Sequence, residues 1–147
     1  MKNIKKLDEL QLLKRGNIFK HGLFLLIGLL LFNAFLYSYG IKWTSGKWDE
    51  LTIVLFVIVW CSIEFIIYDI YPFSEKRQKY LIYFCGLFGV VALIACIYDL
   101  TIGNVAVLID GKITESALGV VYSLMFIAIW IIYIIKTKYN AMHENDE

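Results

Sequence analysis

Charged residues, histidine, cysteine and proline are scarce in this 147-residue chain. Only 18% of the residues are charged, against about 25% in a typical soluble domain, and there is a single proline. Two histidines and three cysteines, without a Cys-x-x-Cys pair, provide no zinc-binding pattern and no disulfide framework. The sequence also lacks a glycine-rich phosphate loop, H-E-x-x-H and G-x-S-x-G. We therefore expect a protein that is not an enzyme and that holds no metal or other cofactor.

The charge balance likewise gives no reason to expect a nucleic-acid partner. The formal net charge is +1, and no basic patch is interleaved with stacking aromatic residues in a polar context. What the chain has in abundance is apolar surface, since 60% of its residues are hydrophobic and 16% are aromatic. This composition indicates a membrane protein with several spans, whose first partner is the lipid bilayer.

Four apolar runs are long enough to cross a bilayer as helices. A helix rises about 1.5 Å per residue, so about 20 residues cover the roughly 30 Å of hydrocarbon. The sequence therefore predicts an all-α fold, a four-helix transmembrane bundle that forms a single membrane domain over residues 22–135. The expected spans are residues 22–41, 51–71, 80–98 and 117–135.

Polar segments flank this domain. Lys and Arg alternate with Leu and Ile at near-helical spacing in residues 1–21, which predicts a short amphipathic helix on the membrane surface. A basic leader that only sets the topology is the alternative. Residues 136–147 form a polar tail that we expect to be disordered. Eleven of the 14 Lys and Arg residues lie in the leader, the second loop and the tail, so both termini are predicted to be cytoplasmic.

The two remaining loops carry local signals. Trp43 and Trp48 lie in the short polar loop between the first two spans, and we expect them to be interfacial anchors. The loop at residues 99–116 contains an alternating apolar run that ends at Asp110-Gly111. Asp-Gly after a β-prone run favours a type I′ turn, so we predict a small extracytoplasmic hairpin.

A stripe of small residues runs along the third span. Gly86, Gly89 and Ala92 recur at helical spacing between Cys85 and Cys96. Lipid provides no hydrophobic drive between helices, so small residues that let two backbones approach closely matter more there than in water. We therefore predict that Gly86, Gly89 and Ala92 form a helix-packing seam.

One carboxylate stands inside an apolar run. Glu64 lies seven residues before Tyr71, the expected end of the second span, and so about 10 Å inside the membrane. With no Lys or Arg at that depth, desolvation favours the neutral acid, which could donate a hydrogen bond to Asn33 of the first span. Glu64 is then either a proton-exchanging group or a polar contact between helices, worth about 0.6–2 kcal/mol.

Two short features of the sequence also point to a family. A charged leader with the pattern D-E-x-Q at residues 8–11 opens onto a span that contains Asn33, and a later span ends in an acidic and aromatic stretch from Glu64 to Pro72. In these features the chain resembles a group of small multi-span Firmicutes membrane proteins. The resemblance implies a bacterial membrane protein and carries no established activity. Four-span dimeric multidrug exporters have their essential glutamate in the first span, whereas Glu64 lies in the second, so their function is not transferred.

These features together predict a multi-pass protein of the bacterial plasma membrane. The expected role is that of a non-enzymatic accessory, regulatory or immunity-type protein, whose partner beyond the bilayer would be a second copy or another membrane protein. The alternative is a small oligomeric transporter that is coupled to protons through Glu64.

Overall fold

The computed structural model describes residues 9–45, 48–70, 75–102 and 106–143. Four helices dominate it, and all four are long and apolar enough to cross a membrane. The predicted all-α four-helix bundle is therefore confirmed. In chain order the elements are α1 (Glu9–Ser38), α2 (Trp48–Ile67), α3 (Glu75–Ile102), β1 (Leu108–Ile109), β2 (Lys112–Ile113) and α4 (Glu115–His143).

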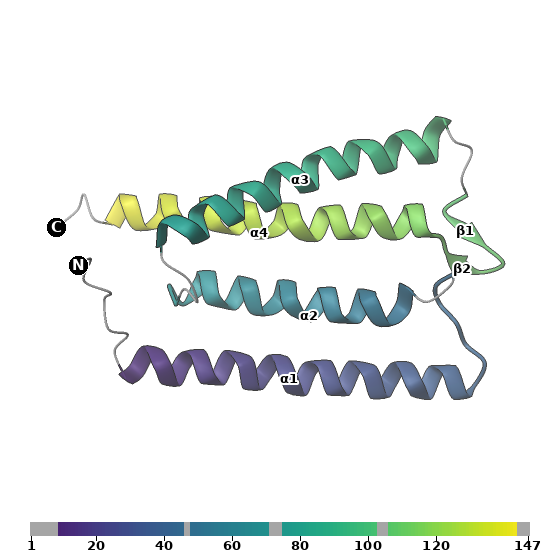
Figure 1. Ribbon diagram of the computed structural model, residues 1–147, viewed down its shortest axis with the longest axis horizontal. Helices are drawn as coiled ribbons and strands as arrows, with labels where there is room; N and C mark the ends of the chain where they lie inside the picture. Colours follow the sequence, from purple (N-terminus) through teal and green to yellow (C-terminus); the bar gives the residue numbers. More distant parts are fainter. Residues whose placement is uncertain (1–8, 46–47, 71–74, 103–105, 144–147) are drawn as a thin grey trace.

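The helices lie side by side in the order α1, α2, α4, α3 (Figure 1). Successive helices run in opposite directions, so the start of α1 and the end of α4 lie at the same end of the bundle, here named the terminus end. The β1–β2 hairpin lies at the other end, here named the hairpin end. In this arrangement α1 stands at an edge and makes its main contacts with α2.

Helix α1 joins two segments that the sequence pattern predicts as separate helices. It runs for 30 residues without interruption, about 45 Å, so the leader from Glu9 onward and the first span are one helix. The expected surface helix is thus not a separate element in the described part of the leader. The helix ends at Ser38, before the predicted Ile41, because Gly40 adopts a φ of 75° and the N–H of Ile41 donates to the carbonyl of Leu36 (3.1 Å).

Helix α2 is shifted toward the N-terminus relative to the predicted span at residues 51–71. It ends at Ile67 because Asp69 takes up a left-handed conformation with a φ of 53°. The N–H of Ile70 then donates to the carbonyl of Phe65 (3.1 Å), and the two side chains pack together, as in a Schellman motif. This early end changes the depth of Glu64, which stands one turn before the last helical residue.

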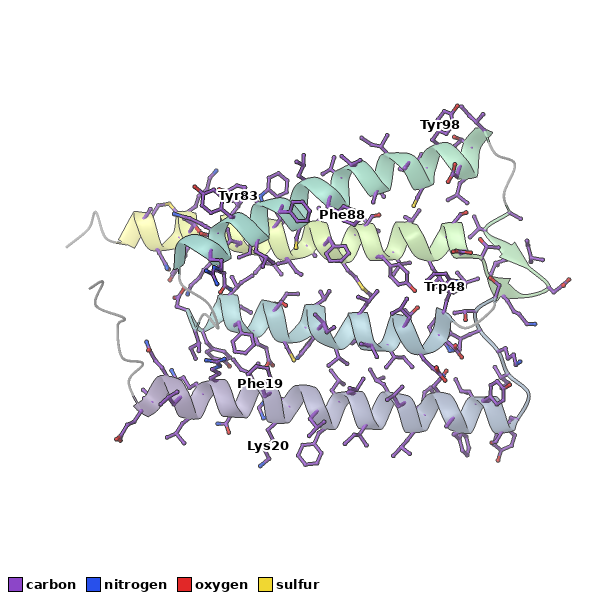
Figure 2. The ribbon with its side chains drawn as sticks, in the orientation of Figure 1. Phe19, Lys20, Trp48, Tyr83, Phe88 and Tyr98 are labelled. Carbon is purple, nitrogen blue, oxygen red and sulfur yellow. The ribbon has the colours of Figure 1, made fainter. Side chains whose placement is uncertain are left out.

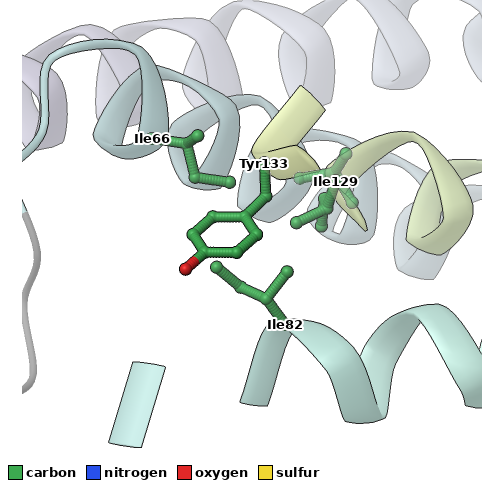
Figure 3. Packing of buried hydrophobic residues seen from close by; sticks show 5 residues of the cluster. Ile66, Ile82, Ile129 and Tyr133 are labelled. Carbon is green, nitrogen blue, oxygen red and sulfur yellow. The ribbon is translucent and has the colours of Figure 1, made fainter. Parts of the chain in front are cut away.

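Helices α3 and α4 both extend beyond their predicted spans. Residues 136–143 continue α4 as helix, so the expectation of a disordered tail is wrong for these residues, and residues 144–147 lie outside the described part. The largest core cluster joins α2, α3 and α4 on the terminus-end side of the bundle, where Tyr133 packs among isoleucines from all three helices (Figure 3). Its buried members are Val59, Ile66, Ile82, Ile129 and Tyr133.

The hairpin forms as predicted. Strands β1 and β2 pair antiparallel, with Leu108 opposite Ile113, and the turn residues Asp110 and Gly111 have φ values of 50° and 72°. Positive φ at both central positions is the signature of a type I′ turn. The loop between α1 and α2 is attached to this hairpin, because the N–H of Ile113 donates to the carbonyl of Trp43 (2.9 Å). The hairpin and the loop together cover one end of the bundle.

Candidate functional site

Asn33 is a buried polar side chain of α1 at the hairpin end that makes two hydrogen bonds. It is 9% exposed, and its Oδ1 accepts a hydrogen bond from Trp43 Nε1 (2.8 Å). Its Nδ2 donates to Asp49 Oδ2 (3.3 Å). A buried amide is unfavourable unless it is hydrogen-bonded, and here both ends of the amide are used. Asn33 therefore ties the α1–α2 loop and the start of α2 to α1.

The predicted hydrogen bond between Asn33 and Glu64 is wrong. The rings of Phe19 and Phe65 lie 5.3 Å apart, so Glu64 is level with the region of Phe19. Asn33 lies fourteen residues further along α1, a distance of about 20 Å. The antiparallel register of α1 and α2 thus places the two polar groups at opposite ends of their shared interface.

A glycine sets this register. Cys61 Sγ on α2 lies where the side chain of any larger residue at Gly22 would stand, and Val57 Cγ1 lies 3.8 Å from that position. The backbones of α1 and α2 can approach this closely because residue 22 has no side chain. Gly22 was not among the residues predicted from the sequence, because its contact with Cys61 joins positions far apart in the chain.

The Glu64 carboxylate accepts a hydrogen bond from a side chain of its own helix. Trp60 Nε1, one turn earlier on α2, donates to Glu64 Oε1 (3.2 Å). Oε2 is buried and has no hydrogen-bond partner in the described part of the chain. Glu64 lies three residues before the end of α2 at Ile67, about 4.5 Å, rather than the predicted 10 Å. Lys20, although close in level, points away from α2 (Figure 2).

Charged side chains mark the boundary of the bundle just beyond Glu64. Lys14 Nζ lies 5.9 Å from the centre of the Tyr68 ring. Lys136 Nζ lies 3.2 Å from Asp69 Oδ2. Cations that pair with rings and carboxylates at helix ends are typical of the level at which a bilayer meets water. Glu64 therefore stands about one turn inside that level.

The hairpin end holds a second link between helices. Thr52 on α2 donates its hydroxyl proton to the carbonyl of Trp48 (2.6 Å), so the Tyr122 hydroxyl of α4 donates to Thr52 Oγ1 (2.6 Å). Trp48 begins α2 at this end (Figure 2), and Trp43 is half-buried beside Asn33. Their role as interfacial anchors stays a prediction.

Two hollows lie on either side of Asn33. One is apolar, with a volume of about 260 Å³, and is formed by α1, α2, Trp43 of the loop between them and Met125 of α4. The other has a volume of about 830 Å³ and mixes polar and apolar walls. Its lining residues are Leu30, Asn33, Ala34, Tyr37, Lys42, Thr44, Asp49 and Glu50. This cavity could not be predicted from the sequence, because it is formed where the α1–α2 loop folds back against the two helices.

The small residues of α3 face α4. A Cβ atom at Gly86 would lie 2.5 Å from the Trp130 ring, and one at Gly89 would lie 3.0 Å from the Ser123 carbonyl oxygen. Ala92, the third member of the predicted seam, is half-buried. Cys96 Sγ lies 2.6 Å from the position of a Cβ at Gly119, so α4 contributes a glycine of its own to the contact.

The described residues contain no group of three or more His, Cys, Asp or Glu side chains that could hold a metal ion. The cysteines at positions 61, 85 and 96 are free thiols. Comparison with known proteins finds no matching family model, no matching curated protein and no matching solved structure for this chain.

Proposed function

We propose that this multi-pass protein is a non-enzymatic accessory, regulatory or immunity-type protein of a bacterial plasma membrane, with both termini in the cytoplasm. One observation carries the proposal. Among the described residues, the side-chain hydrogen bonds and ion pairs that join different helices lie near the two ends of the bundle, at Asn33 and Thr52 on one side and at Asp69 on the other. The middle of the bundle is held together by apolar packing.

A bundle of this kind is suited to contact with other membrane components rather than to transport. Transport pathways are lined by polar or ionisable groups, and they commonly involve broken helices. Here α1 is continuous and stands at the edge of the bundle, and many of its large apolar side chains are exposed, with Phe24 64% exposed. A second copy or another membrane helix can therefore reach α1 without displacing any contact of the bundle.

A photo-reactive amino acid in place of Phe24 tests this proposal in native membranes. The matched position is Leu87 on α3, which is 66% exposed and also apolar. A cross-linked product of defined mass from position 24, identified by mass spectrometry, supports an accessory role. Cross-links to lipid alone from both positions would contradict it.

A proton-coupled transporter is the second candidate, and one observation favours it. Glu64 Oε2 is buried without a partner in the described part of the chain, as expected of a group that exchanges a proton. The test is proton flux in proteoliposomes, with Glu64→Gln as the matched variant because it keeps the acceptor for Trp60. Proton-linked currents that disappear in Glu64→Gln would favour the transporter, and wild-type vesicles without such currents would exclude it.

A further inference from the structure

We propose that the cavity of about 830 Å³ at the hairpin end binds the ammonium group of a small zwitterionic amine. Ethanolamine phospholipids and free amino-acid-like compounds both carry this chemistry. The proposal concerns a binding site and stands independently of the accessory role.

The walls of the cavity carry charges of both signs. Asp49 and Glu50 extend from the first turn of α2, and Lys42 lies on the preceding loop. Lys42 Nζ is held 4.8 Å from the centre of the Tyr37 ring, on the α1 wall. Two carboxylates attract an ammonium group, and a lysine beside them attracts the anionic part of the same molecule. A zwitterion therefore matches this lining better than a simple anion does.

The carboxylates differ in how they are held. Asp49 Oδ2 accepts from Asn33, which itself is fixed by Trp43, so Asp49 is oriented before any ligand arrives. Glu50 is exposed and forms no hydrogen bond or ion pair within the described part of the chain. A fixed acceptor and an adjustable one together suit an ammonium group, which offers several N–H donors at once.

A separate observation points to a polar ligand at this wall. Thr44 lines the cavity and is only 2% exposed, yet its Oγ1 has no hydrogen-bond partner in the described part of the chain. Buried hydroxyl groups without a partner are rare, and each one calls for an explanation. The backbone around Thr44 is fixed, because its neighbour Ser45 donates its N–H to the carbonyl of Ile113 (3.0 Å). Thr44 is therefore held on a rigid backbone at the wall of the cavity.

The position of the cavity indicates where the amine comes from. Its α1 wall runs from Leu30 to Tyr37, the last part of the helix before the hairpin end, and Trp43 and Trp48 lie at the same end of the bundle (Figure 1). The apolar hollow shares Asn33 with the cavity and includes Phe56 and Met125. Aromatic side chains at such a level are typical of the headgroup region. A lipid headgroup and a free zwitterion can both reach a cavity at this level, and the experiment separates them.

Native mass spectrometry of the delipidated full-length protein tests the site. The probes are phosphatidylethanolamine, phosphatidylglycerol with the same acyl chains, and free O-phosphoethanolamine. We expect an amine-bearing probe to bind, and Glu50→Gln to weaken its binding about tenfold by the loss of one charge-assisted contact. Glu115→Gln is the matched control, because Glu115 lies in the first turn of α4 at the same end and does not line the cavity.

Thr44→Val provides an independent variant. It keeps the size of the side chain and removes the hydroxyl, which has no partner to lose in the described part of the chain. We expect unchanged thermal stability and weaker binding of the amine-bearing probe. A lower thermal stability of Thr44→Val with unaltered probe binding would show that the hydroxyl stabilises the fold, and would contradict its place in the binding site.

The binding of the three probes distinguishes a lipid headgroup from a soluble zwitterion. Binding of phosphatidylethanolamine without competition from free O-phosphoethanolamine supports a lipid headgroup as the ligand. Binding of free O-phosphoethanolamine alone supports a soluble zwitterion. Equal binding of phosphatidylglycerol and phosphatidylethanolamine, binding of no probe, or equal effects of Glu50→Gln and Glu115→Gln would overturn the proposal.

Discussion

The partner of Asn33 can be tested by a double-mutant cycle. Asn33→Leu keeps a side chain of similar size and removes both hydrogen bonds of the amide, to Trp43 and to Asp49. Hydrogen bonds between membrane helices are worth about 0.6 kcal/mol on average and up to about 1.7 kcal/mol. The variant should therefore lose about 1–3 kcal/mol of unfolding free energy, to which the unpaired indole N–H of Trp43 contributes.

Trp43→Phe supplies the second arm of the cycle because it removes the indole donor and keeps an aromatic ring. If the Trp43 to Asn33 hydrogen bond at 2.8 Å stabilises the fold, the two changes should be coupled by about 1 kcal/mol. The same cycle between Asn33→Leu and Glu64→Gln should give no coupling beyond about 0.3–0.5 kcal/mol, because residues this far apart act independently. Reversible unfolding in mixed micelles, followed by tryptophan fluorescence with circular dichroism as a check, gives the free energies.

The pattern of the two cycles decides between the two pairings. Coupling of Asn33 to Trp43 without coupling to Glu64 agrees with the antiparallel register in which Phe19 meets Phe65. Coupling of Asn33 to Glu64 would require α1 to slide by about 20 Å along α2 and would refute the register described above.

Three further predictions concern packing, topology and the acid at the terminus end. Gly86→Leu should destabilise the bundle by about 1–3 kcal/mol or prevent folding, because a Cβ at this position meets the facing tryptophan ring at 2.5 Å. Gly28→Leu is the control: a Cβ there has no neighbour within 4 Å, so this variant should be neutral in the same unfolding assay. In a background without the native cysteines, Lys112→Cys should react with an impermeant maleimide from outside the cell and Lys138→Cys should not; the reverse pattern would invert the topology. Glu64→Gln should change the unfolding free energy by less than about 0.5 kcal/mol, since the amide still accepts from its neighbouring indole; a loss above about 2 kcal/mol would mean that the carboxylate has a partner of its own.

Hydropathy was sufficient to predict the four helices, because about twenty apolar residues in a row leave few alternatives to a spanning helix. The hairpin was also predictable, since Asp110-Gly111 is a local signal for a turn whose φ values are positive at both positions. These features depend on residues close together in the sequence, so a single chain is enough to infer them.

Helix ends and register were less accessible to sequence analysis. The apolar and aromatic pattern continues from Ile66 to Tyr71, so it contains no sign that Asp69 adopts a left-handed conformation and ends α2 at Ile67. The hydropathy of the chain changes near residue 21, but the helix continues through this point. A change in hydropathy is therefore not a helix boundary here, and the leader from Glu9 onward and the first span form one helix. The register of α1 against α2 depends on the fit of Cys61 into the space beside Gly22, a contact between distant residues that no local pattern reveals.

The early end of α2 also changes the energetics of Glu64. Glu64 stands about 4.5 Å from the end of its helix rather than the 10 Å expected from the sequence, so it lies close to the level at which charged side chains occur. Trp60 already donates to one oxygen, and the cationic side chains of Lys14 and Lys136 mark the water boundary nearby. For Glu64 to carry protons across the membrane, it would have to communicate with the hairpin end, where the nearest polar group on α1 is Asn33, about 20 Å away. Apolar packing separates these two levels, so the polar groups of the described residues gather near the two ends of the bundle, with Glu64 at one end and the cavity beside Asp49 at the other.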